Sequence, residues 1–218
     1  MKKLTLVTSV ASAVALSFAA SMPVQAEPSF SGNVGFVSDY YFRGANLGDG
    51  GVYAGLDYEN SGLYVGTWWI DDATGGNDGM ENDWYIGYGQ ESDSFSWNIG
   101  YNNYQYTYSN DFEHEVVLTL GAAGFSLDLV LGEDDDVDTD AEDYSIALLG
   151  YSHGAYGITV GHFEFNDIDD SDYQWIEASV SGDIVEGISA TLSIGAKAAD
   201  GENNDGYMVL DLSKSFDL

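Results

Sequence analysis

The chain has 218 residues, of which 37 are acidic and only five are basic, and it contains no cysteine. A formal net charge of −32 at pH 7 leaves no basic patch for phosphates, which excludes nucleic acid as a partner. The absence of cysteine excludes disulfides and thiolate metal sites. Intrinsic disorder is also excluded, because 44% of the residues are hydrophobic and 14% are aromatic.

The first 26 residues have the pattern of a secretory signal peptide. Two lysines follow the initial methionine, an apolar stretch covers 4–20, and Val24-Gln25-Ala26 provides small residues for cleavage. A membrane anchor is the alternative, but Ser and Thr interrupt the stretch and it ends at a cleavage site. We expect removal of 1–26 and a single domain over 27–218 with a net charge of −34.

From Ser29 onward, apolar residues alternate with polar or small ones, which is the period of a β-strand with one apolar face. In the first such segment Phe30, Val34, Phe36, Tyr40 and Phe42 occupy the even positions. Most of the segments reach the ~9–11 residues that a tilted strand needs to cross a membrane. The predicted strands are 29–43, 51–59, 62–70, 82–90, 94–106, 113–122, 124–132, 143–152, 155–165, 173–182, 187–198 and 206–218.

The connections between these strands alternate in length. Tight turns such as 59–62 and 91–94 consist of Gly, Asn, Asp, Ser and Glu, whereas connections such as 71–81 and 133–142 are long and acidic. Short periplasmic turns and long external loops are typical of outer-membrane barrels. We therefore predict an all-β fold, a twelve-stranded antiparallel up-and-down transmembrane β-barrel in the lipid of a Gram-negative outer membrane, with both termini periplasmic. A soluble β-sandwich is the alternative, although it rarely follows a secretory leader.

Aromatic residues cluster near the predicted strand ends, as in the two aromatic girdles of a membrane barrel. The inner girdle would contain Phe30, Phe95, Trp97 and Phe216. The outer girdle would contain Tyr40, Tyr41, Phe42, Trp68, Trp69, Trp84, Tyr85, Tyr104, Tyr106, Phe163, Phe165, Tyr173, Trp175 and Tyr207.

The last strand has the form that the barrel-assembly machinery reads. Met208, Leu210, Leu212 and Phe216 share one face, and the chain stops at Leu218, where a terminal aromatic residue is usual. We expect this strand to make the assembly machinery a partner of the chain.

Three motifs resemble the TorF family of outer-membrane porins, whose members are often described only as conserved hypothetical proteins. The motifs are the opening strand 33–44, the segment 62–68 and the closing segment 213–218. The resemblance implies a porin-like role in the outer membrane, and it brings no established substrate and no catalytic residues. We expect a channel for the passive passage of small solutes. The alternative is a non-conducting structural or adhesive barrel that displays acidic loops.

Charged residues on the non-apolar parity of the strands are candidates for the pore lining, since an interior charge must be hydrated or paired. They are Asp39, Arg43, Asp57, Asp83, Glu115, Asp128, Glu177, Lys197 and Asp211. The excess of carboxylates predicts a preference for cations. Arg43 has two interpretations: an ion pair that closes the seam between the first and last strands, or a constriction residue that tunes permeation.

No cofactor is expected, and the three histidines lack a nucleophile motif, so we predict no enzymatic activity. The acidic loop 133–143 has the oxygen density that Ca²⁺ favours, and Asp134, Asp136 and Asp138 would be its ligands, although the loop lacks the EF-hand spacing. The alternative is a solvated, mutually repelling surface.

Overall fold

The computed structural model describes residues 28–72, 79–107, 112–135, 142–166, 172–199 and 205–218. The predicted leader lies outside these ranges and stays a prediction. No helix in the described ranges is long and apolar enough to cross a membrane. Twelve strands are present: β1 (Ser29–Phe42), β2 (Ala45–Asn60), β3 (Leu63–Asp72), β4 (Gly79–Glu91), β5 (Ser96–Tyr106), β6 (Phe112–Ala122), β7 (Phe125–Asp135), β8 (Glu142–His153), β9 (Tyr156–Phe165), β10 (Tyr173–Val185), β11 (Ile188–Ala199) and β12 (Asp205–Asp217).

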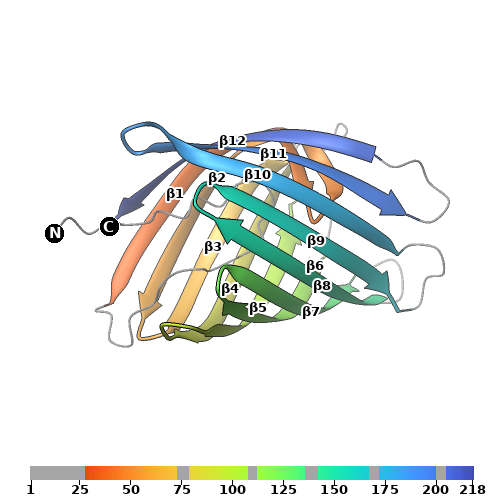
Figure 1. Ribbon diagram of the computed structural model, residues 1–218, viewed down its shortest axis with the longest axis horizontal. Helices are drawn as coiled ribbons and strands as arrows, with labels where there is room; N and C mark the ends of the chain where they lie inside the picture. The colour runs from red at the N-terminus through yellow and green to blue at the C-terminus, as the bar shows by residue number, and fades with distance from the viewer. Residues whose placement is uncertain (1–27, 73–78, 108–111, 136–141, 167–171, 200–204) are drawn as a thin grey trace.

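The strands form one closed barrel (Figure 1). Each strand pairs antiparallel with the next along the chain, and β1 closes the barrel by pairing with β12. β1 begins and β12 ends at the same end of the barrel, as an even number of strands requires. The predicted twelve-stranded antiparallel up-and-down barrel is confirmed.

The outer face is apolar, as the alternating pattern predicted. Val34, Phe36, Val52, Leu56 and Ile86 are each between 42% and 59% exposed. Most residues assigned to this face on the later strands are also exposed, such as Phe95, Ile99, Phe125, Leu129, Leu131, Tyr156, Ile158, Leu192, Ile194 and Met208. Exposed apolar side chains on nearly every strand would be unfavourable in water, and they match the lipid-facing band of a membrane barrel.

The predicted outer aromatic girdle is wrong for half of its members. Seven of them are buried in the barrel interior rather than exposed on its surface: Tyr40, Trp68, Tyr85, Tyr104, Tyr173, Trp175 and Tyr207. In a run of adjacent aromatic residues, alternate side chains must face opposite sides of the sheet. Trp84 is 51% exposed and its neighbour Tyr85 only 5% exposed. One aromatic residue of this pair therefore lies on the outer face of the barrel and the other on the inner face.

Interior tyrosines lie over glycines of the neighbouring strand. Tyr85 of β4 is paired with Gly66 of β3, which is in turn paired with Asp57 of β2. A Cβ atom on Gly66 would come within 2.4 Å of the Tyr85 ring, so the glycine leaves room for the ring to lie flat on the wall. The Tyr85 hydroxyl then donates a hydrogen bond of 2.5 Å to Asp57. We call this arrangement a tyrosine–glycine–acid row.

Two further rows repeat this register. Tyr207, Gly195 and Glu177 are paired across β12, β11 and β10, and Tyr144, Gly132 and Glu115 across β8, β7 and β6. Their hydroxyl-to-carboxylate hydrogen bonds are 3.0 and 3.1 Å long. Each row joins three strands with side chains that the backbone pairing already places opposite one another, so it strengthens the barrel wall.

Substitution of Gly66 by alanine should destabilise the barrel by about 1–3 kcal/mol, because the added methyl group overlaps the Tyr85 ring and displaces its hydroxyl from Asp57. Gly182→Ala is the matched control, since a Cβ atom there would have no heavy atom within 4 Å. Urea unfolding of the refolded barrel in lipid vesicles measures both changes. Equal stability losses in the two variants would contradict the role of the rows.

Candidate functional site

The tip of the first hairpin leaves the barrel wall. β1 pairs with β12 only as far as Val37, and β2 pairs with β3 only from Tyr53 onward. Between these two points β1 and β2 continue to pair with each other, up to Phe42 opposite Ala45. Within the described residues, positions 38–52 therefore have strand partners only in β1 and β2 themselves. We call this segment the inward hairpin, and the contacts below define where it lies.

Glycines make the bend possible. A Cβ atom on Gly50 would lie 2.3 Å from the carbonyl oxygen of Ser38, and one on Gly51 would lie 2.2 Å from that of Asp71. At the tip, Arg43 and Gly44 both have positive φ angles, 49° and 82°, which is typical of a tight type I′ hairpin turn. A side chain is therefore excluded at both bend positions, and the turn points Arg43 beyond the end of the paired strands.

One side of the inward hairpin contacts β3, β4 and β5. The Tyr40 ring lies 6.2 Å from that of Trp68 on β3, and the Tyr40 hydroxyl donates a 2.9 Å hydrogen bond to Glu81 on β4. The Phe42 ring lies 6.0 Å from that of Tyr104 on β5. These contacts bury Tyr40 to 4% exposure.

The other side contacts β10 and β12. The Tyr41 ring stacks on that of Tyr207 at 4.2 Å, and a Cβ atom on Gly44 would lie 2.5 Å from Cβ of Trp175. Ala45 packs against a buried cluster that includes Tyr144, Trp175 and Val130 of β7. Because the hairpin touches walls on opposite sides of the barrel, it crosses the interior.

Arg43 anchors the tip to β6. Its Nη1 atom pairs with Oε1 of Glu115, and its Nη2 atom lies 3.0 Å from Oε2, so the contact is bidentate. Glu115 also accepts hydrogen bonds from the hydroxyls of Tyr104 (2.9 Å) and Tyr144 (3.1 Å). Both charged side chains are buried, Arg43 at 6% and Glu115 at 1% exposure. Such a fully bonded carboxylate holds a guanidinium in one orientation.

The Arg43–Glu115 ion pair excludes one of the two interpretations of Arg43. The seam interpretation is wrong, because the partner carboxylate lies on β6 and not on β12. On the seam itself, Asp211 of β12 accepts a 2.8 Å hydrogen bond from Tyr53 of β2. The sequence could not identify this partner, because the inward bend brings together residues 72 positions apart. The constriction interpretation stays a prediction.

The other predicted lining residues lie on the same inner face, with one exception. Asp57, Asp128 and Glu177 accept hydrogen bonds from Tyr85, Thr119 and Tyr207 of other strands, and Asp83 is 2% exposed. The Lys197 ammonium lies 4.6 Å from the centre of the Tyr173 ring. Asp39 is the exception: it lies within the inward hairpin, half-exposed and opposite Asp49.

Sequence reasoning missed Glu81 and Glu113, which share a strand face with Asp83 and Glu115. Glu81 accepts the Tyr40 hydrogen bond, and Glu113 accepts one of 3.2 Å from Tyr106. The sequence did contain a signal for them: each lies two residues before an acid that was assigned to the inner face, and residues two apart on a strand share a face. Glu81 was not assigned because the predicted fourth strand began only at residue 82, whereas β4 begins at Gly79.

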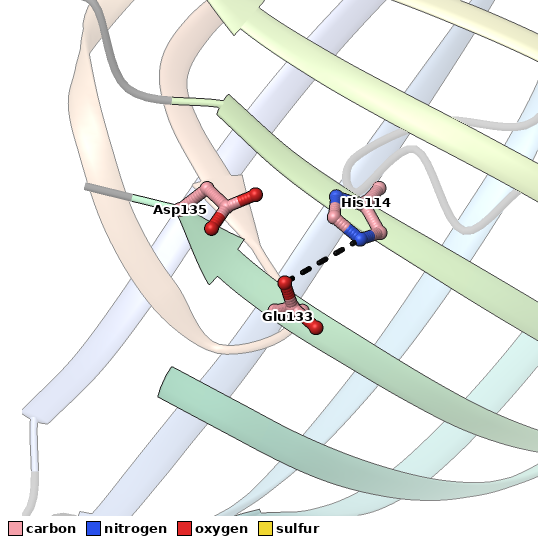
Figure 2. Close-up of side chains that lie close together, drawn as sticks. All are labelled: His114, Glu133 and Asp135. Atoms are coloured by element: carbon pink, nitrogen blue, oxygen red, sulfur yellow. Dashed lines mark ion pairs between the residues drawn. The ribbon is translucent and has the colours of Figure 1, made fainter. Parts of the chain in front are cut away.

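The predicted calcium ligands are not brought together in the described residues. Glu133, Asp134 and Asp135 belong to β7 rather than to a loop, and Asp136 and Asp138 lie outside the described residues. A different group is close together at this end of the barrel: His114, Glu133 and Asp135, whose ligand atoms all lie within 4.8 Å of one another (Figure 2). His114 is one of the three histidines for which the sequence indicated no catalytic motif.

A family model described as a bacterial protein of unknown function (Gcw_chp) matches residues 23–214. The chain belongs to this family. The description of Gcw_chp assigns no activity, and membership of the TorF family stays a prediction. A comparison with curated proteins finds no match.

Two solved structures are similar in fold, and a third matches more weakly. The KdgM porin matches with a TM-score of 0.55 and 9% identity over 85% of this chain and 98% of that one. A structure from work on the in-meso crystallization of membrane proteins matches with a TM-score of 0.55 and 8% identity over 87% of this chain and 84% of that one. OccAB4 of Acinetobacter baumannii matches with a TM-score of 0.45 and 10% identity over 87% of this chain. The match covers only 62% of the length of OccAB4. At these identities the likeness shows the fold alone.

Proposed function

We propose that this Gcw_chp protein is an outer-membrane, porin-like channel that passes small solutes by diffusion and prefers cations. The observation that carries the proposal is a closed barrel with an apolar outer face and an inner face rich in carboxylates. The similarity in fold to the KdgM porin supports it. Asp57, Glu115, Asp128, Glu177 and Asp211 accept hydrogen bonds from hydroxyl groups, and no catalytic role is proposed for the acids of the inner face.

The inward hairpin would set the width of this channel. A solute that crosses the barrel must pass beside the tip, where Arg43, Tyr40 and Phe42 contact β6, β4 and β5. Twelve strands enclose a lumen between the filled interior of eight-stranded barrels and the open channel of sixteen-stranded porins. We therefore expect small, steady currents rather than the large currents of wide porins.

The membrane location follows from the outer face and is tested first. The mature chain should be extracted only with detergent and should resist proteases except at its long loops, because the apolar residues of the outer face need lipid or detergent contact. We propose that β12 presents the signal for the assembly machinery. Recovery of a stable monomer without detergent would contradict the membrane location.

The cation preference follows from the charges inside the barrel. Arg43 is neutralised by Glu115, which leaves Lys197 as the remaining basic candidate against Asp57, Asp83, Asp128, Glu177 and Asp211. A lumen with this excess concentrates cations and repels anions, and the effect at its mouth is screened over ~8 Å at physiological ionic strength. Reversal potentials under a KCl gradient in planar bilayers should show cation preference that decreases as the salt concentration rises. Anion preference would contradict this assignment of the lining.

A second candidate function is a non-conducting barrel that displays its acidic loops. One observation favours it: residues of the inward hairpin belong to or pack against two buried apolar clusters, one that contains Tyr40, Trp68 and Val209 and another that contains Val130, Tyr144 and Trp175. The absence of single-channel currents from the refolded wild-type barrel would favour this function over the channel.

A further inference from the structure

The outward-facing side chains of β6 and β7 change from apolar to polar towards the barrel end where Phe112 and Asp135 lie. Val116 and Leu131, which are paired, are 47% and 69% exposed and belong to the apolar outer face. The next outward pair is His114 opposite Glu133, and the pair after it is Phe112 opposite Asp135. Within two residues along each strand, the apolar face is thus replaced by groups that can bind a metal ion. They lie beyond the apolar row, where an ion in solution can reach them.

The three ligand atoms already converge. The Nε2 atom of His114 lies 3.9 Å from Oε1 of Glu133, and Asp135 lies on the same face two residues further along β7 (Figure 2). Two ligands that are each ~2.0–2.2 Å from one tetrahedral zinc ion lie ~3.3–3.6 Å apart. The His114–Glu133 separation is only a few tenths of an ångström longer, so small side-chain rotations would close it and would bring in Asp135 from within the 4.8 Å that bounds the group.

The surroundings restrict the imidazole. The Phe112 ring stacks on the His114 ring with centroids 6.1 Å apart, and the Tyr101 ring lies 6.1 Å away on the neighbouring strand. The backbone positions are set by the β6–β7 pairing, which continues from Phe112 to Ala122. A site on paired strands loses less conformational entropy on binding an ion than one on a loop.

We propose that His114, Glu133 and Asp135 form a binding site for a borderline divalent ion such as Zn²⁺. One imidazole nitrogen and two carboxylate oxygens match the three protein ligands of an open zinc site, with water as the fourth ligand. Ca²⁺ and Mg²⁺ prefer sites made only of oxygen, so imidazole selects against them. The strongly negative chain raises the local concentration of any divalent ion. The bound ion would connect β6 to β7 at the rim.

Calorimetric titration of the detergent-purified protein with ZnCl₂ tests the site. Wild type should bind one Zn²⁺ per chain in addition to any weaker, salt-sensitive binding. His114→Ala should weaken this binding at least tenfold, and Glu133→Gln should weaken it as well. His162→Ala is the matched control, because His162 is also outward-facing but lies opposite Gln174 and Ala147, neither of which is acidic.

Two further measurements separate this site from a general attraction of cations to acidic loops. Zn²⁺ should raise the unfolding temperature of wild type but not of His114→Ala, since binding stabilises only the folded barrel. Binding of CaCl₂ should be the same in both proteins. Zn²⁺ binding that is unchanged in His114→Ala, or reduced equally in His162→Ala, would overturn the proposal whether or not the barrel conducts.

Discussion

Replacement of residues 39–49 by Asn-Gly should raise the single-channel conductance several-fold. Val37 and Gly51 are paired where β1 and β2 leave the wall, so a two-residue type I′ turn after Ser38 closes the hairpin at the edge of the wall. The variant lacks Tyr40, Phe42 and Arg43, which reach β4, β5 and β6 across the interior. The cross-section that they occupy becomes available to water and ions.

The comparison of wild type with this variant also separates the two candidate functions. Currents from both proteins, larger in the variant, support a channel narrowed by the inward hairpin. Currents from the variant alone support the non-conducting barrel, with the hairpin as its plug. Heat-dependent electrophoretic migration checks that the variant has folded. Equal conductance in the two folded proteins would contradict any narrowing by the hairpin.

The strands and their outer face could be predicted because the lipid-facing requirement acts on every second residue. Val34, Phe36 and Val52 are exposed as expected, and β3 to β12 begin and end close to the predicted positions. The prediction from this alternation was wrong at Tyr40, which is buried rather than lipid-facing. Val37 and Tyr40 are both buried although they are three residues apart, and the register of β1 against β2 shifts between Tyr40 and Tyr41.

The inward hairpin could not be predicted from apolar periodicity, because an aromatic residue suits both the lipid face and a packed interior. The signal for the inward hairpin in the sequence was its glycines rather than its apolar residues. Gly48, Gly50 and Gly51 stand close together at the start of the predicted second strand, which begins six residues later than β2 does. Glycines at such a density indicate close backbone approach as much as a loop. Tyr85 and Tyr207, the tyrosines of two of the tyrosine–glycine–acid rows, were assigned to the outer girdle because their partner glycines lie on other strands and could not be identified from the sequence.

Replacement of Arg43 by alanine should release the inward hairpin. The substitution removes the bidentate contact and leaves Glu115, only 1% exposed, without its cationic partner. Breaking one half of a buried ion pair costs ~3–5 kcal/mol, and the lower end of this range is expected because Tyr104 and Tyr144 continue to donate to Glu115. Urea unfolding in vesicles should show this loss. Single-channel records should show transitions to larger, more cation-preferring currents.

The double variant Arg43→Ala with Glu115→Gln separates the effect of the unpaired Glu115 charge from the effect of releasing the inward hairpin. It removes the buried unpaired carboxylate, so its stability loss should be smaller than the sum of the two single losses. The cation preference should return towards that of wild type, while the larger currents should remain because the tip is still not anchored. Lys197→Ala is the control, since its ammonium contacts Tyr173 on the wall and not the inward hairpin. Additive stability losses together with wild-type currents in Arg43→Ala would show that the ion pair does not hold the hairpin, and the packing of Tyr40, Tyr41 and Phe42 would then account for its position.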